Sequence, residues 1–261
     1  MANDWLLHYH SDERGFADRA AEWLERAGEC HVTKVTDFLD PRQVQIVQSI
    51  ANRYLDKTAL YYTGGYAEAE RQRVVIVPDY LDPQMEDPGI VVLAITSSDD
   101  RIKELDHGDY MGAILGLGIK RDKVGDIHVL ENGCHCLIAA EIANYFDIHL
   151  RQVHRVQVMT EILPVDKLLT SKTEYDEMSL SVASMRLDGI ISDVCRLSRA
   201  KALVPIQAGR CRVNFKTESD PSKSLKEGDV VSLQGFGRFR VLEVEGVSKK
   251  GRTRVRVGKY K

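Results

Sequence analysis

The sequence predicts an α+β protein of three parts. An N-terminal helical region precedes a central layer of helices on one face of a largely antiparallel sheet, and a C-terminal domain of two helices and a small twisted sheet follows. Two observations lead to this assignment. Apolar residues recur at helical spacing early in the chain, and β-rich apolar runs bounded by turn residues come after them.

Charge divides the chain in the same way. Residues 1–179 hold 18 Lys/Arg and 31 Asp/Glu, a balance of −13, whereas residues 180–261 hold 18 Lys/Arg and 8 Asp/Glu, a balance of +10. Such a split indicates that the C-terminal part binds a polyanion, although basic residues can also merely solvate a surface. We expect a helical region at 1–72, an αβ domain at 73–165, a linker at 166–179 and a basic domain at 180–261.

Two helices are predicted in the N-terminal region. Residues 11–28 carry one apolar face, with Ser11 as the N-cap and Gly28 at the C-terminal end. Residues 40–55 form the second helix, with Asp40 as the cap and a proline at the first helical position. The glycines and polar residues that follow predict a turn and a short helix or loop.

The central part alternates strands and helices. Strands are expected at 73–80, 89–98 and 153–163, a hairpin at 126–139, and helices at 106–118 and 140–150. The resulting order β-β-α-β-β-α-β is close to the RRM-like αβ plait that many RNA-binding proteins use. A fold alone does not establish RNA binding.

The basic domain is expected to begin with helices at 186–194 and 197–209. Ser198 is a plausible N-cap of the second helix, and Gly209 lies just past its end. A helix N-terminus favours an anion, so Arg199 in the first turn suits a nearby phosphate. Arg210 and Arg212 alternate along the next strand and should share a face.

The tail is also basic. Arg252, Arg254 and Arg256 are expected on one face of a strand, where they could follow a phosphate backbone, and Tyr260 could stack on a base. A solvated β face is the alternative. The candidate RNA-binding residues are Arg186, Ser198, Arg199, Lys201, Arg210, Arg212, Asn214, Lys216, Arg238, Arg252, Arg254 and Arg256.

The basic domain resembles an S4 domain, the α-L RNA-binding motif. The resemblance rests on Arg186-Leu187-Asp188, Ser198-Arg199, Ala202, Gly209, Val213-Asn214 and Gly228-Asp229. It implies that the two helices and the following strand pack into structured RNA. Pro205 departs from the family pattern and is expected to kink the second helix or end it early.

Nearly the entire chain resembles the bacterial YlmH family. The stretch "YYTGGYAEAERQR" carries this resemblance together with Gly112, Gly116, Leu117, Gly118, Ile119, Lys120, Arg121, Gly125 and Asp126. It implies a cytoplasmic, ribosome-associated RNA-binding protein, with rRNA or tRNA and the large ribosomal subunit as partners. It also implies work on stalled peptidyl-tRNA complexes in translation quality control. The acidic N-terminal half could bind a protein.

Two other functions stay open. One is an RNA-modifying enzyme like the pseudouridine synthases, because Arg186-Leu187-Asp188 also occurs in the motif of those enzymes. The Thr and Gly that should follow are missing, so we expect no catalytic residue. Asp188 more simply pairs with a neighbouring arginine or caps the first helix. The third possibility is an adaptor in cell division or photosystem assembly, to which relatives of the family are linked.

No cofactor or metal is expected. Cys134 and Cys136 lack a second ligand pair at zinc-finger spacing and should pack on one face of a strand, with His135 on the other. The five scattered cysteines fit a reducing compartment. Neither a membrane span nor a signal peptide is expected. The basic loop that contains Lys120, Arg121 and Lys123 could be solvated or contact RNA.

Overall fold

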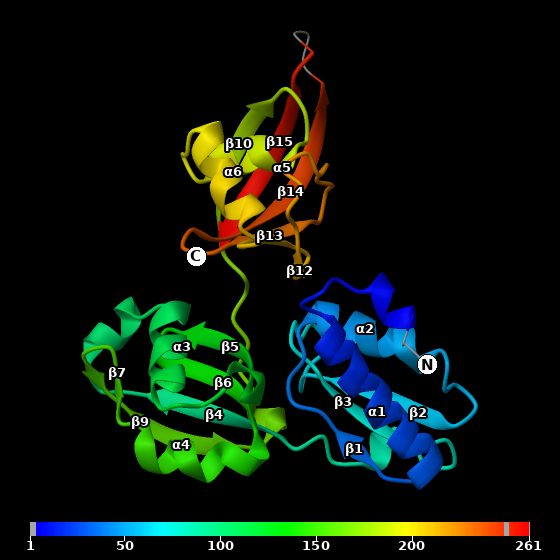
Figure 1. Ribbon diagram of the computed structural model, residues 1–261. Helices are drawn as coiled ribbons and strands as arrows, with labels where there is room; N and C mark the ends of the chain where they lie inside the picture. The colour runs from blue at the N-terminus through cyan, green and yellow to red at the C-terminus, as the bar shows by residue number, and fades with distance from the viewer. Residues whose placement is uncertain (1–3, 248–250, 261) are drawn as a thin grey trace. The chain divides into compact units, whose positions relative to one another are not determined.

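The computed structural model describes residues 4–247 and 251–260. The chain folds into two compact units, Met1–Ser171 and Lys172–Lys261, each of mixed α/β structure (Figure 1). No helix in the described residues is long and apolar enough to cross a membrane. Short 3-10 helices occur at Asp4–His8, Pro83–Met85, Asp100–Glu104, Arg121–Lys123, Ala140–Ile142 and Val165–Lys167.

The first part of unit 1 is two helices packed on a small antiparallel sheet. The helices are α1 (Arg14–Cys30) and α2 (Pro41–Ala51), and the strands are β1 (Lys34–Val35), β2 (Thr58–Thr63) and β3 (Arg73–Pro78), in the order β1-β3-β2. Leu24, Val47 and Ile76 are fully or almost fully buried between helices and sheet. Sequence analysis missed β1 and β2, so this region is less helical than expected.

The ends of the two helices compare differently with the sequence predictions. The N-cap of α1 is Glu13, not Ser11, and the helix runs past Gly28 to Cys30 before His31 turns into the left-handed region at φ 56°. The predicted start of α2 is confirmed, because Asp40 accepts from the backbone of Gln43 in a capping box.

The second part of unit 1 is a four-stranded antiparallel sheet. Its elements are β4 (Ile90–Thr96), α3 (His107–Gly116), β5 (Val124–Leu130), β6 (Gly133–Ala139), α4 (Ala143–His149) and β9 (Met159–Leu163), and the strand order is β5-β6-β4-β9. This is a β-α-β-β-α-β connectivity. The strand predicted at 153–163 is split: β7 (Gln152–Val153) and β8 (Val156–Gln157) form a tight hairpin before β9.

One strand lies in a different sheet from the one expected. We expected residues 73–80 to open the central sheet, but β3 pairs with β1 and β2 in the first sheet. The central sheet therefore begins at β4. A strand's partner is decided by tertiary packing, which its own alternation of side chains does not encode.

Both faces of the central sheet are covered. On one face, Cys134 and Cys136 are buried with Tyr110 of α3 and Phe146 of α4, as expected for packing residues, and burial raises the pKa of Cys136 to about 12. The opposite face is built from Ile90, Val92, Leu137 and Ala139, and it is covered by Phe38, Tyr66, Val165 and Leu168. Phe38 and Tyr66 come from the first part of unit 1.

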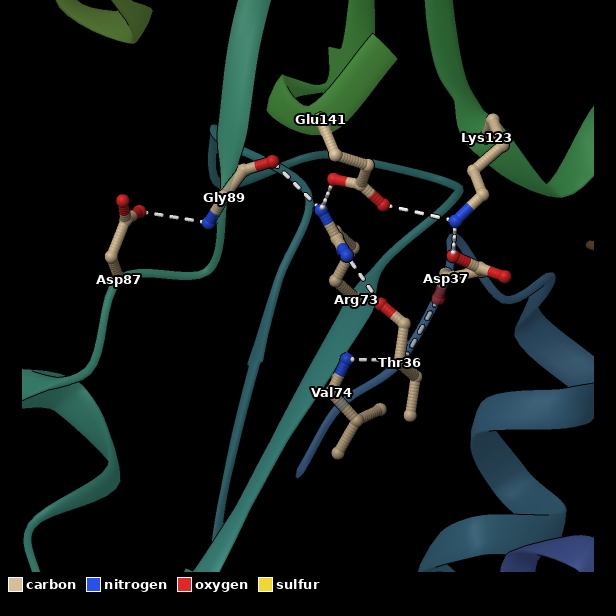
Figure 2. Close-up of polar contacts among 8 residues, drawn as sticks. All are labelled: Thr36, Asp37, Arg73, Val74, Asp87, Gly89, Lys123 and Glu141. Atoms are coloured by element: carbon tan, nitrogen blue, oxygen red, sulfur yellow. Dashed lines mark hydrogen bonds and ion pairs between the residues drawn. The ribbon is translucent and has the colours of Figure 1, made fainter. Parts of the chain in front are cut away.

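A buried arginine joins the two parts of unit 1. Figure 2 shows Arg73 of β3, whose guanidinium donates to the carbonyls of Thr36 at 2.6 Å and Gly89 at 2.7 Å. Its Nη1 lies 3.3 Å from Glu141, and only 6% of its side chain is exposed. Lys123 pairs with both Asp37 (2.6 Å) and Glu141 (2.9 Å) in the same network.

Unit 2 is a six-stranded antiparallel sheet with two helices on one face. Its elements are β10 (Tyr175–Val182), α5 (Leu187–Val194), α6 (Arg199–Gln207), β11 (Cys211–Val213), β12 (Lys216–Thr217), β13 (Val230–Leu233), β14 (Gly237–Val247) and β15 (Thr253–Tyr260), and the strand order is β10-β15-β14-β13-β11-β12. β10 begins inside the stretch expected to be a linker and runs across the expected boundary at residue 180. It pairs with β15 along its whole length.

The two helices of unit 2 lie where the sequence placed them. Arg186 is the N-cap of α5, Ser198 is the N-cap of α6, and Gly209 follows the second helix at φ 68°. Pro205 is buried within α6, and the helix continues beyond it to Gln207, where the amide of Ala208 donates to the carbonyl of Val204. The early end that we considered for this helix does not occur.

Candidate nucleic-acid interface

The sheet of unit 2 has one covered face and one open face. Val231, Phe239 and Val257 point toward α5 and α6 and are almost fully buried. Side chains alternate along each strand, so their neighbours point to the other side. There, Arg212, Arg238, Arg240, Arg254 and Arg256 are exposed or half-buried; we call this surface the open face.

The start of α6 carries the first group of predicted site residues. The hydroxyl of Ser198 accepts from the backbone of Lys201 at 3.3 Å. The side chains of Arg199 and Lys201 are exposed in the first turn. Nη2 of Arg199 lies close above Gly189 of α5, 3.4 Å from the position that a Cβ on Gly189 would take. The helix N-terminus and two cations thus form one electropositive edge.

Arg186 is held by a carboxylate. It donates to both oxygens of Asp188, at 3.1 and 3.0 Å, and Asp188 also accepts from the backbone of Gly189 at 2.8 Å. The hydrogen bonds from Arg186 are the main cause that lowers the pKa of Asp188, against a burial that raises it. The expected pairing of Asp188 with an arginine is confirmed.

Four aromatic and basic side chains form a row across the open face. Register places Arg212, Ser232 and Arg238 opposite one another on neighbouring strands. The guanidinium of Arg238 lies 5.4 Å from the ring centre of Phe215 and 4.5 Å from that of Tyr260. Tyr260 in turn meets Tyr175 edge to face at 5.0 Å. We call Phe215, Arg238, Tyr260 and Tyr175 the ring row.

The three tail arginines have different surroundings. Arg256 pairs with Glu243 at 2.7 Å and Glu177 at 3.2 Å, and the hydrogen bond that it donates to Glu243 is the main cause that raises its pKa. Arg252 precedes β15 and donates to the carbonyl of Ser181, whereas Arg254 is exposed within the strand. Lys249, Lys250 and Lys261 of the predicted basic tail lie outside the described residues.

Two further site residues lie at the β11–β12 turn. The amide of Asn214 donates to Asp229 at 2.8 Å and accepts from the backbone of Val230 at 2.9 Å, so it fastens this turn to β13. Asn214 has a φ of 50°, which asparagine tolerates better than most residues. Lys216 is exposed in the edge strand β12, and Arg210 is exposed just before β11.

Comparison with known proteins assigns the family. Residues 12–81 match the family described as "YlmH, N-terminal", and residues 83–167 match "Putative RNA-binding domain in YlmH". Over 253 residues the chain is 34% identical to ribosome-associated protein quality control protein P2 of Bacillus subtilis (strain 168), with 97% of each chain covered. The chain belongs to the YlmH family. A solved structure titled "Cell division protein ylmH from Streptococcus pneumoniae" is 27% identical with a TM-score of 0.54, covering 62% of this chain and 98% of that one.

The YlmH signature residues meet between the two parts of unit 1. Asp126 accepts from the hydroxyl of Tyr66 at 2.9 Å and from the backbones of Glu70 and Arg71 at 2.7 and 3.1 Å. Arg71 donates onward to the carbonyl of Phe38 at 2.7 Å. The sequence identified these residues only as a family pattern. It did not predict that Asp126 holds the loop from Tyr66 to Arg71 by hydrogen bonds.

Close packing explains two glycines of that signature. A side chain on Gly125 would lie 2.8 Å from the ring of Phe38, and one on Gly64 would lie 2.3 Å from the carbonyl of Arg71. The basic loop is also used internally, because Arg121 donates to the carbonyls of Val124 and Gly125 and Lys123 forms the ion pairs described above. Lys120 remains exposed.

Two histidines hold the end of unit 1 against the sheet. His135 accepts from the backbone of Leu169 at 3.0 Å, and its cross-strand neighbour His128 accepts from Ser171 at 3.3 Å. Burial is the first cause that lowers the pKa of both imidazoles, so both are held neutral as acceptors. We call the segment from Leu168 to Ser171 the strap.

Proposed function

We propose that this YlmH-family chain is a non-catalytic, ribosome-associated RNA-binding protein whose unit 2 grips structured RNA as an S4 domain. The observation that carries the proposal is the arrangement of exposed cations on unit 2. Arg199 and Lys201 flank a capped helix N-terminus, and Arg210 and Arg212 follow just before and within β11. Such a surface suits the phosphates of folded RNA.

The ribosomal partner is inferred from the relative. The Bacillus subtilis protein, similar along nearly its whole length, is named for ribosome-associated quality control. We therefore propose the large ribosomal subunit carrying stalled peptidyl-tRNA as the target, and the cytoplasm as the location. rRNA and tRNA would both offer the phosphate surfaces that the cations of unit 2 fit.

The charge of each unit suggests which role it has. The basic unit 2 would bind the RNA phosphates, while the acidic unit 1 would dock by shape or by contact with protein. We propose residues 12–81 as an N-terminal domain and residues 83–167 as an RRM-like plait. The S4 domain would begin near residue 172, because β10 completes its sheet.

The enzyme alternative lacks a reactive group at the motif that suggested it. Asp188 is 9% exposed at its side chain and bonded on both oxygens by Arg186. A catalytic carboxylate must reach its substrate, whereas this one fixes the start of α5. Cell division remains a second candidate because the Streptococcus pneumoniae structure is titled a cell division protein.

The test is co-sedimentation of the full chain with purified large ribosomal subunits. The variant Arg199→Glu/Arg210→Glu/Arg212→Glu should lose most of its binding and keep its unfolding midpoint, since all three side chains are exposed. The matched control is Arg19→Glu/Arg151→Glu/Arg155→Glu, three exposed arginines of unit 1, which should bind within about twofold of the parent.

Two results would contradict the proposal. Equal binding by both triple variants would remove the S4-type surface from the interaction. A change in the molecular mass of the RNA after incubation with the parent chain would indicate a modifying enzyme instead of a binding protein.

A further inference from the structure

The open face of unit 2 carries aromatic rings as well as cations. Arg238 lies between the rings of Phe215 and Tyr260, and Tyr175 continues the row at the edge of the sheet. The ring of Tyr175 lies directly over Gly258, where an added side chain would come within 2.8 Å of it. Because the backbone itself leaves room for this ring, the ring row is held in place by the fold.

A hollow of about 400 Å³ lies at the Tyr175 end of the ring row. It is lined by Tyr175, Glu227, Gly228, Arg240, Val241 and Leu242. An aromatic ring, a carboxylate and a guanidinium at one hollow offer a stacking surface together with a hydrogen-bond acceptor and a donor. These are the groups with which proteins hold an unpaired base.

The charge on this face suits a nucleic acid strand. Glu177 and Glu243 are occupied by Arg256, which leaves Arg212, Arg240 and Arg254 as exposed cations of the open face. A double helix exposes phosphates and buries its bases, so a surface of cations alone can bind it. A surface with aromatic rings between cations suits unpaired bases, because each base can stack on a ring while its phosphate contacts an arginine.

We propose that the open face binds unpaired nucleotides of RNA, with bases stacked along the ring row and one base in the hollow beside Tyr175. The proposal rests on the RNA-binding function proposed above and extends RNA binding across the open face, which shares Arg212 with the S4-type surface. The S4-type edge holds structured RNA, and the open face holds a single-stranded segment next to it.

The experiment compares two RNAs bound to the full chain by fluorescence anisotropy. One is a closed hairpin, and the other is the same hairpin with a single-stranded oligouridine extension. The parent chain should bind the extended RNA about tenfold more tightly, since stacking one base contributes about that factor. Tyr260→Leu should lose this gain and still bind the hairpin, whereas Tyr260→Phe should keep the gain. Tyr80→Leu, at a tyrosine 64% exposed in unit 1, is the matched control and should keep it too.

Crosslinking on the parent chain tests the same site without a substitution. With 4-thiouridine in the extension, irradiation should attach RNA to peptides that contain Tyr175 or Tyr260. Crosslinks confined to other peptides would overturn the proposal, and so would a gain that survives in Tyr260→Leu. If the parent chain binds the hairpin but gains nothing from the extension, only the proposal for the open face is overturned. If it binds neither RNA, the proposed RNA-binding function is overturned as well.

Discussion

Replacing Arg73 with methionine should destabilise unit 1 strongly. The side chain is 6% exposed, and its guanidinium provides the donors for the carbonyls of Thr36 and Gly89. Methionine can fill the space but cannot donate, so both carbonyls lose a charge-assisted hydrogen bond. Each such bond contributes about 1.5–3 kcal/mol, which gives a loss of about 3–6 kcal/mol for the two. The ion pair with the half-exposed Glu141 adds little to this figure.

Thermal unfolding followed by tryptophan fluorescence measures the effect on unit 1 alone. The chain has two tryptophans, Trp5 and Trp23, and both lie in the helical part that β3 supports. A loss of about 3–6 kcal/mol in a unit of this size lowers the midpoint by roughly 10 °C or more. The control Arg101→Met removes an exposed arginine paired with Asp99, and its midpoint should stay within about 1 °C of the parent.

A small shift in Arg73→Met would refute this reasoning. If the midpoint fell by less than about 3 °C, the carbonyls of Thr36 and Gly89 would have found other donors, such as water. The two parts of unit 1 would then be held mainly by apolar contacts around Phe38. A parent chain whose unit 1 already unfolds in two steps would also contradict the proposed role, because the two parts would not be one cooperative unit even with Arg73 in place.

Three further predictions concern the termini of unit 2, the strap and the tail. A fragment of residues 172–261 should unfold cooperatively, whereas one of residues 180–261 should not, since it lacks most of β10 and uncovers β15; circular dichroism melting distinguishes them. The imidazoles of His128 and His135 have lowered pKa values in the folded chain, so the unfolded chain binds more protons below about pH 6.5. The free energy of unfolding of unit 1 should therefore fall as pH drops from about 6.5 toward the folded pKa values. Urea titrations measure this, and the variant His128→Asn/His135→Asn should show a weaker pH dependence. If the variant kept the pH dependence of the parent, other groups would be responsible for it. When RNA affinity is measured against salt concentration, Arg254→Gln should reduce the slope of log affinity against log salt by about 0.7–0.9. Arg256→Gln should change this slope less, because Glu177 and Glu243 already neutralise that arginine. Equal changes in the two variants would contradict the structure.

Elements with a local chemical signal could be predicted from the sequence. Asp40 before a proline and Ser198 before a basic turn each mark a helix start, because the capping side chain and the helix it caps are neighbours in sequence. The hairpin of β5 and β6 follows the same logic, although its two-residue turn is Glu131-Asn132 and Gly133 already pairs with Leu130. The candidate site residues were predicted in the same way, since Arg199, Arg210 and Arg212 lie next to such elements.

Features that depend on distant partners could not be predicted. β10 places Met178, Leu180 and Val182 at alternate positions, but this short pattern becomes a strand through β15, which lies far along the chain. The sequence likewise gives no sign that Arg73 enters a buried network, or that Asp126 binds the loop that contains Tyr66. The tail arginines were treated as equivalent, yet the nearby carboxylates Glu177 and Glu243 come from two other strands and pair with Arg256.

The covered face of the central sheet limits how the matched RNA-binding region of YlmH proteins can meet RNA here. In RNA-binding plaits, bases stack on aromatic side chains of the sheet face opposite the helices. In this chain that face holds Ile90, Val92 and Leu137 beneath Phe38 and Tyr66. RNA could reach it only by separating the two parts of unit 1, which would break the hydrogen bonds of Arg73 and expose an apolar surface. Stacking of one base, at about 1–3 kcal/mol, does not offset that cost. Any RNA contact of residues 83–167 is therefore expected on the helices or loops, and stacking is expected on unit 2, where the sheet is open.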